Sequence, residues 1–281
     1  MHNPLTLLSG ISGTSRRHTR NQLISFLAGL AVWCTAGMYA TGVRAATPDT
    51  APPELKTLLS NIDEAANRQD IEAVMQFYSK DVSHADGLTY ENMRKALSDL
   101  WQRYPQLNYR TELQSWQIDG NGIIAETVTV IAGSEKLQDR EMSLTATLRS
   151  RQRYENQKIV QQEILAERTQ LTSGEKPPTV KVQLPDQIRA GQEYNFDAIV
   201  EEPLGNSLLI GTALEEPIQA DTYFNPSTVK LEPLAAGGLF KTGRAPAASD
   251  PHWISAVLVH KDGMTLITER IKIVGGSGTA K

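Results

Sequence analysis

The chain has 281 residues, of which 40% are hydrophobic and 21% charged, a composition typical of a globular protein with one large or two ordinary domains. Its net charge is −4, and the first 45 residues carry four arginines and no acid, so the remainder is more acidic still. An acidic body argues against nucleic acid as a partner. The single cysteine, Cys34, lies near the N-terminus, which excludes a disulfide and a thiolate metal site from the body.

The N-terminal segment has the composition of a targeting signal. A basic run from Ser15 to Arg20 precedes an uncharged stretch from Leu23 to Val43. This order predicts a signal peptide or signal anchor over residues 1–45, either cleaved after Ala45 or retained as an anchor over 23–43. In both cases the positive flank stays inside, so we expect the body to face an extracytoplasmic space.

After a linker over 46–53, apolar residues recur at a spacing of three to four and predict three helices. The first extends from about Pro53 to Asn67. The second follows Asp70, which can cap it, and its apolar side continues to Tyr78. The third opens after Thr89, another capping residue, and ends before a proline.

The apolar period then changes to two, which is typical of strands. A short strand is expected over 81–85, followed by a long one from Leu107 with a bulge near Ser115. Further strands are predicted over 123–132, 141–154 and 159–171. The order indicates an α+β domain in which three helices pack on a bent antiparallel sheet.

A stiff linker over 173–178, which ends in two prolines, is expected to separate this domain, 54–172, from a second one. Roughly seven short strands over 179–274, including a hairpin at Asp262-Gly263, predict a separate all-β sandwich of immunoglobulin-like type. Residues 275–281 read as a disordered tail.

Two stretches carry a family resemblance. They are Asn-Arg-Gln-Asp-Ile-Glu-Ala-Val at 67–74 and Phe-Tyr-Ser-Lys-Asp-Val at 77–82. With the order of elements over about 54–171, they resemble the nuclear transport factor 2-like superfamily in its SnoaL-like branch. The resemblance implies a cystatin-like cone of helices and bent sheet around a pocket.

The complete arrangement also resembles uncharacterised exported proteins of cyanobacteria. The short stretches that carry this likeness are 194–197 (Tyr-Asn-Phe-Asp), 202–205 (Glu-Pro-Leu-Gly) and 253–256 (Trp-Ile-Ser-Ala). It implies a periplasmic or thylakoid-lumenal location and brings no activity with it.

Within the superfamily, the ketosteroid-isomerase-like pattern places its general base at Asp86, and Ile62 stands where that family has the tyrosine that stabilises the oxyanion. A base without this donor lacks the electrostatic stabilisation that is usually largest in such reactions. Asp86-Gly87 is also an ordinary turn sequence.

Spacing adds a second candidate. His84 and Asp86 are two apart, so in an extended strand they share a face and could act as an acid–base pair. The alternative is a histidine bonded to backbone at a strand end. Pocket-lining candidates, which are equally readable as core residues, are Ile62, Tyr78, Tyr90, Trp101, Tyr109 and Trp116.

Arg149, Arg151 and Arg153 form a basic stripe on one strand face and could receive an acidic partner. A solvated face balanced by Glu163 and Glu167 is the alternative. The histidines show no metal-ligand spacing, so we expect neither a metal nor a cofactor.

These observations favour an exported, non-catalytic module whose cone holds a small apolar molecule or a partner segment. One alternative is an isomerase- or dehydratase-like enzyme with Asp86 as its base. Another is an assembly or stability factor for a membrane-associated protein complex, and the sheet could also support a homodimer.

Overall fold

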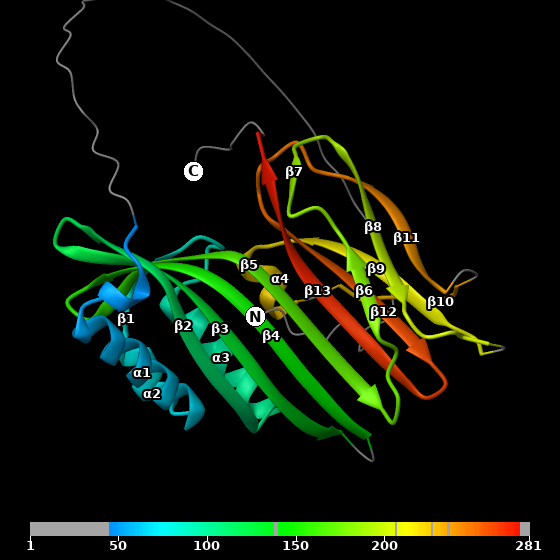
Figure 1. Ribbon diagram of the computed structural model, residues 1–281, viewed down its shortest axis with the longest axis horizontal. Helices are drawn as coiled ribbons and strands as arrows, with labels where there is room; N and C mark the ends of the chain where they lie inside the picture. Colours follow the sequence, from blue (N-terminus) through cyan, green and yellow to red (C-terminus); the bar gives the residue numbers. More distant parts are fainter. Residues whose placement is uncertain (1–44, 138–139, 206, 226, 235–236, 276–281) are drawn as a thin grey trace, which may run out of the picture.

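The computed structural model describes residues 45–275 apart from 138–139, 206, 226 and 235–236 (Figure 1). The predicted targeting segment and nearly all of the predicted tail lie outside this part of the chain. No helix in the described part is long and apolar enough to cross a membrane.

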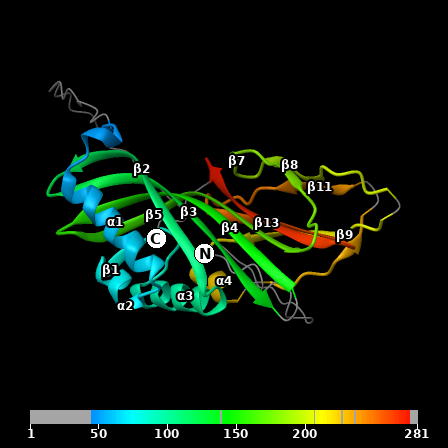
Figure 2. The same cartoon turned by 60° about the horizontal axis from the view of Figure 1, so that its bottom comes forward.

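We call residues 45–174 the first half and residues 175–275 the second half. In the first half, helices lie on one side of a curved sheet (Figure 2). They are η2 (Pro48–Thr50), α1 (Pro53–Asn67), α2 (Ile71–Gln76) and α3 (Tyr90–Arg103). The predicted caps are confirmed, because Asp70 Oδ1 accepts from the Ala73 amide at 3.0 Å and Thr89 Oγ1 from the Asn92 amide at 3.2 Å. The second helix was predicted too long, since α2 ends at Gln76 and Tyr78 already belongs to a strand.

The sheet of this half is an antiparallel meander to which one parallel strand is added. Its strands are β1 (Tyr78–His84), β2 (Gln106–Asp119), β3 (Gly122–Leu137), β4 (Arg140–Glu155) and β5 (Lys158–Gly174). β1 pairs in parallel with β5, and the other neighbours are antiparallel. The expected irregularity near Ser115 is confirmed, because the β2–β3 register shifts between Leu113 and Ser115.

The second half adds short strands and a helix. They are β6 (Val180–Gln183), β7 (Gln187–Arg189), β8 (Glu193–Val200), β9 (Ile210–Pro217), α4 (Ala220–Phe224), β10 (Glu232–Pro233), β11 (Gly238–Arg244), β12 (His252–His260) and β13 (Gly263–Val274). Strands β11, β8 and β6 form a small sheet of their own. The prediction of an all-β region missed α4.

The expectation of a separate sandwich was wrong in one central respect. β13 pairs antiparallel with the end of β5, from Gly263 opposite Gly174 to Glu269 opposite Arg168. A single ten-stranded sheet therefore runs through both halves (Figure 1): eight strands follow in the order β10-β9-β12-β13-β5-β4-β3-β2, while β1 pairs with β5 and β7 with β13. β5 continues past the helices, and there its backbone N–H and C=O groups form hydrogen bonds with β13 rather than with water.

The hydrophobic core follows the shared sheet. One cluster joins Val74 and Trp101 of the helices to Leu171 of β5 and Val257 and Leu266 of the second half. A second cluster fills the space between the two sheets of the second half. The two halves therefore share apolar contacts as well as backbone pairing.

Candidate functional site

Two partly open cavities lie between the helices and the sheet of the first half. The first, of about 160 Å³, has apolar walls from α1 and α3 and a polar floor of sheet side chains. Ile62, Tyr78 and Tyr109 line it, as the sequence predicted. Asp63, at its edge, accepts hydrogen bonds from the Thr111 amide and hydroxyl, both at 2.6 Å, so this carboxylate is already satisfied.

The second cavity, of about 140 Å³, adjoins the first and shares Tyr78, Leu97, Leu148 and Gln162 with it. Its walls are mostly apolar. Gln162 is a polar residue that lines both cavities. Its Oε1 is buried and has no hydrogen-bond partner within the described chain. Burial raises the pKa of the Tyr78 hydroxyl to about 12, so this group is neutral at ordinary pH.

A buried ion pair stands beside the second cavity. Asp86, in the turn after β1, accepts from the Arg270 guanidinium of β13 at 3.0 and 2.7 Å and from the Tyr223 hydroxyl of α4 at 2.7 Å. Burial on its own would raise the pKa of Asp86, but the Arg270 guanidinium and the Tyr223 hydroxyl hold it below its usual value. Asp86 therefore remains a carboxylate that joins the two halves.

Glu167 of β5 completes this group. Its Oε2 accepts from the Trp253 indole at 3.0 Å and lies 3.6 Å from Arg270 Nη2, and the side chain lines the second cavity. Its other oxygen, Oε1, is buried without a hydrogen-bond partner among the described residues. We name Asp86, Glu167, Tyr223, Trp253 and Arg270 the junction cluster.

His84 lies next to the junction cluster but does not form the predicted acid–base pair. Its Nδ1 accepts the Asp86 amide at 3.2 Å and is 3.9 Å from Asp86 Oδ2. Burial lowers the pKa of His84 to about 4, so the ring is neutral near pH 7. The alternative of a backbone-bonded histidine describes this geometry, and His84 also lines the second cavity.

Asp86 is poorly placed to act as the predicted general base. Both of its oxygens accept from Arg270, and one also accepts from Tyr223. A base must reach the proton that it removes, and Asp86 lines neither cavity. Ile62 lines the first cavity, where it offers no hydrogen-bond donor.

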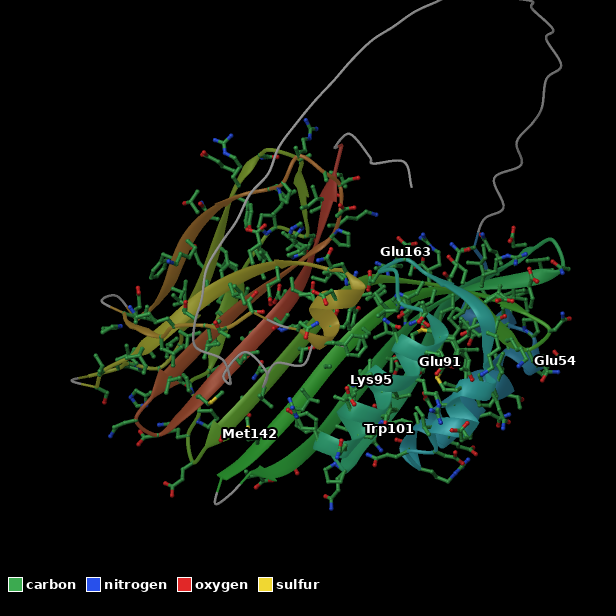
Figure 3. All side chains as sticks on the ribbon, turned by 180° about the vertical axis from the view of Figure 1, so that it is seen from behind. Glu54, Glu91, Lys95, Trp101, Met142 and Glu163 are labelled. Carbon is green, nitrogen blue, oxygen red and sulfur yellow. The ribbon has the colours of Figure 1, made fainter. Side chains whose placement is uncertain are left out.

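The remaining aromatic candidates lie outside the two cavities. Trp101 lies on α3 (Figure 3). Its indole N–H donates to the Tyr109 hydroxyl at 2.8 Å within the core. Tyr90 donates to the Met75 carbonyl, and Trp116 donates to Thr47 and Thr50 near η2. Packing and helix anchoring, rather than ligand contact, account for these three side chains.

The arginine stripe is paired with carboxylates of the same sheet. Arg149 and Arg151 both contact Glu126, and Arg151 also contacts Glu163. Arg153 contacts Asp119 and Glu155. A docking role for the stripe stays a prediction. The expected balance by Glu163 is confirmed, whereas the same expectation for Glu167 was wrong, because that side chain turns inward.

A bulge in β5 explains why the two glutamates face opposite ways. Arg149 is opposite Ala166 and Ser150 is opposite Ile164, so Leu165 is an extra residue in the strand. One extra residue reverses the alternation of side chains. Sequence reasoning therefore missed Glu167, and it missed Tyr223 and Arg270 because their partners are remote in the chain.

Residues 175–274 match a family described as "Domain of unknown function (DUF8623)". No curated protein matches the sequence.

Among solved structures, the chain is similar to Bd1075 of Bdellovibrio bacteriovorus at 16% identity and a TM-score of 0.29, and the match spans 40% of each chain. It is also similar to a putative SnoaL-like polyketide cyclase from Shewanella putrefaciens CN-32, at 13% identity and a TM-score of 0.31, over 41% of this chain and 89% of that one. A SnoaL-like polyketide cyclase from Agrobacterium tumefaciens C58 gives 16% identity and 0.29, over 41% and 91%. Similarities of this size say nothing about substrate or activity.

Proposed function

We propose that the protein is an exported, non-catalytic binding protein whose first half holds a small, mostly apolar molecule in the two adjoining cavities. The observation that carries the proposal is the position of Gln162. It lines both cavities, and its Oε1 is enclosed without a partner in the described structure. A buried acceptor left unpaired is costly, so a ligand that donates one hydrogen bond would be favoured there.

The size and walls of the cavities support a small ligand. At about 160 and 140 Å³, each is below the roughly 300 Å³ at which ligand pockets usually begin, and together they approach it. Leu97 and Leu148 contribute to both, so one molecule could extend from one cavity into the other. Apolar walls with one or two polar groups are the usual composition of such sites.

The second half takes part in binding by closing the second cavity. Tyr223 of α4 lines that cavity and is fixed through Asp86 to Arg270 of β13. A ligand there would contact both halves of the chain. The pairing of Asp86 with Arg270 and Tyr223 supports binding over base catalysis, and the N-terminal sequence supports export.

The test uses the full chain with a small probe and with natural extracts. Hexan-1-ol titrated into isotopically labelled protein should shift the amide and side-chain resonances of Gln162 and Leu148. Native mass spectrometry after incubation with lipid and isoprenoid extracts should show a retained small molecule. Unchanged resonances together with an unliganded mass spectrum would refute the proposal.

A further inference from the structure

The junction cluster holds more negative than positive charge. Asp86 and Glu167 are two carboxylates, whereas Arg270 is the one cationic side chain in the cluster. Side-chain exposure is 3% for Arg270, 1% for Asp86 and 2% for Glu167, so water screens none of them. An enclosed charge without a compensating partner is strongly unfavourable.

The hydrogen bonds leave one carboxylate oxygen of the cluster unpartnered, and Arg270 Nε is also buried without a partner in the described residues. Asp86 uses both oxygens on Arg270 and Tyr223, and Glu167 Oε2 faces Trp253 and Arg270. Glu167 Oε1 is the carboxylate oxygen left over, buried and without a partner in the described residues. His84 adds no positive charge to the cluster near pH 7, because its Nδ1 accepts the Asp86 amide and burial lowers the pKa of the ring to about 4.

The cavity beside this atom suits an organic cation and not a metal ion. Glu167 lines it together with Met75, Leu88, Met93 and Tyr223, which offer thioether, aliphatic and aromatic surface. In the described residues no group of three or more His, Cys, Asp or Glu side chains could hold a metal. A small ammonium group, in contrast, gains from carboxylate oxygens and from aromatic faces together.

A second acceptor lies in the same cavity. Gln162 lines it as well, and its Oε1 is also enclosed without a partner in the part of the chain described. The unsatisfied oxygens of Glu167 and Gln162 therefore favour a ligand that carries hydrogen-bond donors. A primary ammonium has three donors and no acceptor.

We propose that the second cavity binds the ammonium group of a small primary amine at Glu167 Oε1, with the apolar tail of the amine extending past Gln162 into the first cavity. This inference rests on the proposed binding function and names its ligand class. Leu97 and Leu148, which line both cavities, contact the tail where it passes between them. Arg270 does not line the cavity. Glu167 therefore separates the ammonium group of the ligand from the Arg270 guanidinium.

The experiment compares two probes of the same shape on the full chain at pH 7, hexylammonium and hexan-1-ol. An alkylamine is cationic at this pH because its pKa is close to the 10.4 of lysine. Isothermal titration calorimetry should show hexylammonium binding about tenfold to a hundredfold more tightly, the size of a charge-assisted hydrogen bond. The indole N–H resonance of Trp253 should shift with hexylammonium, because that group donates to Glu167.

Two variants locate the effect. Glu167→Gln keeps the shape but removes the charge, so the preference for hexylammonium should fall to about one. Glu163→Gln is the matched control, because Glu163 lies on the same strand but faces outward toward Arg151, and the preference should persist. If Glu167→Gln does not fold, the Trp253 indole resonance of the native protein serves as the test. Tighter binding of hexylammonium than of hexan-1-ol without a shift of that resonance would overturn the proposal.

The outcomes separate this inference from the binding function itself. Equal affinity for both probes would overturn the ammonium inference and leave the binding function intact. Failure of both probes to bind would count against both. A preference that survives Glu167→Gln would place the cation elsewhere and refute the assigned site.

Discussion

Asp86 and Arg270 are 184 positions apart in the chain, yet two hydrogen bonds of 3.0 and 2.7 Å join them inside the protein. The pair connects the turn after β1 to β13, at the place where β13 continues the sheet of β5. Tyr223 of α4 completes the contact. The second half is therefore part of the wall of the second cavity, because Tyr223 lines it.

Replacement of Arg270 by methionine should destabilise the protein strongly. The variant leaves Asp86 and Glu167 buried without their shared cation. Removal of one partner from a buried pair usually costs about 3–5 kcal/mol, because the remaining charge is uncompensated. Urea denaturation of Arg270→Met at pH 7 should give a loss of this size.

Arg168→Met is the matched control. Arg168 of β5 pairs with Glu269 of β13 across the same strand boundary, but its side chain is 45% exposed. An exposed pair usually contributes about 1 kcal/mol or less. Equal losses in the two variants would mean that burial does not govern the strength of the Arg270 pair.

Stability should fall as the pH falls between about 6.5 and about 4. Burial lowers the pKa of His84 from 6.5 to about 4, so in this window the unfolded chain binds a proton that the folded chain does not. The loss could reach about 3 kcal/mol at the lower end, at 1.36 kcal/mol for each pKa unit. The pKa of Asp86 is also lowered, so its contribution is lost at still lower pH.

His84→Asn tests the origin of this slope. The asparagine oxygen can still accept the Asp86 amide but has no proton to gain, so the dependence between pH 6.5 and 4 should become shallower. Denaturation at several pH values measures it. An unchanged slope would assign the dependence to other groups.

Local patterns in the sequence predicted much of the first half. Asp70 and Thr89 cap helices as expected, and the β2 bulge falls where the alternation breaks near Ser115. These features depend on neighbours in the sequence, so they can be read there. Glu163 and Glu167, four apart, seemed to share a face until the bulge at Leu165 separated them.

The long-range part could not be read in the same way. The sequence grouped His84 with Asp86, but Arg270 and Tyr223 meet them only through the pairing of β13 with β5. The residues after Leu171 looked like a linker because of the following prolines. In the structure Thr172 to Gly174 complete β5, since an available ladder outweighs the local turn signal, and the chain leaves the sheet only after Gly174.

Enlargement of Ala66 should close the first cavity at little cost in stability. Ala66 of α1 lines that cavity, so Ala66→Leu puts its added carbons into empty space. Affinity for hexan-1-ol should fall at least about tenfold, because the probe and the new side chain compete for the same volume. Calorimetry measures the affinity, and denaturation should show a change of less than about 1.5 kcal/mol.

Ala65→Leu is the control, because it makes the same substitution at the neighbouring position of the same helix. Ala65 is 1% exposed but does not line the cavity, so Ala65→Leu should overpack the core and cost about 1–3 kcal/mol. Folded Ala65→Leu protein should keep its affinity for hexan-1-ol. Unchanged probe binding in Ala66→Leu would place the probe outside the first cavity.

The strand junction itself can be tested at Gly174, the last residue of β5. Its φ of +102° is unfavourable for other residues, and an added Cβ would lie 2.5 Å from both the Asp262 carbonyl oxygen and the Gly263 Cα. Gly191 also has a positive φ, +73°, but a Cβ there would meet nothing within 4 Å. Gly191→Ala should therefore cost about 1–2 kcal/mol from the backbone alone.

Gly174→Ala should cost more, about 3 kcal/mol or above, because the backbones of β5 and the β12–β13 turn must also separate. Thermal unfolding of both variants measures the difference. If the two halves were separate domains, the turn could move away from Gly174 and the two alanine variants would lose the same stability. A larger loss at Gly174 means that the β5–β13 pairing resists this separation, which is what a binding site built from both halves requires.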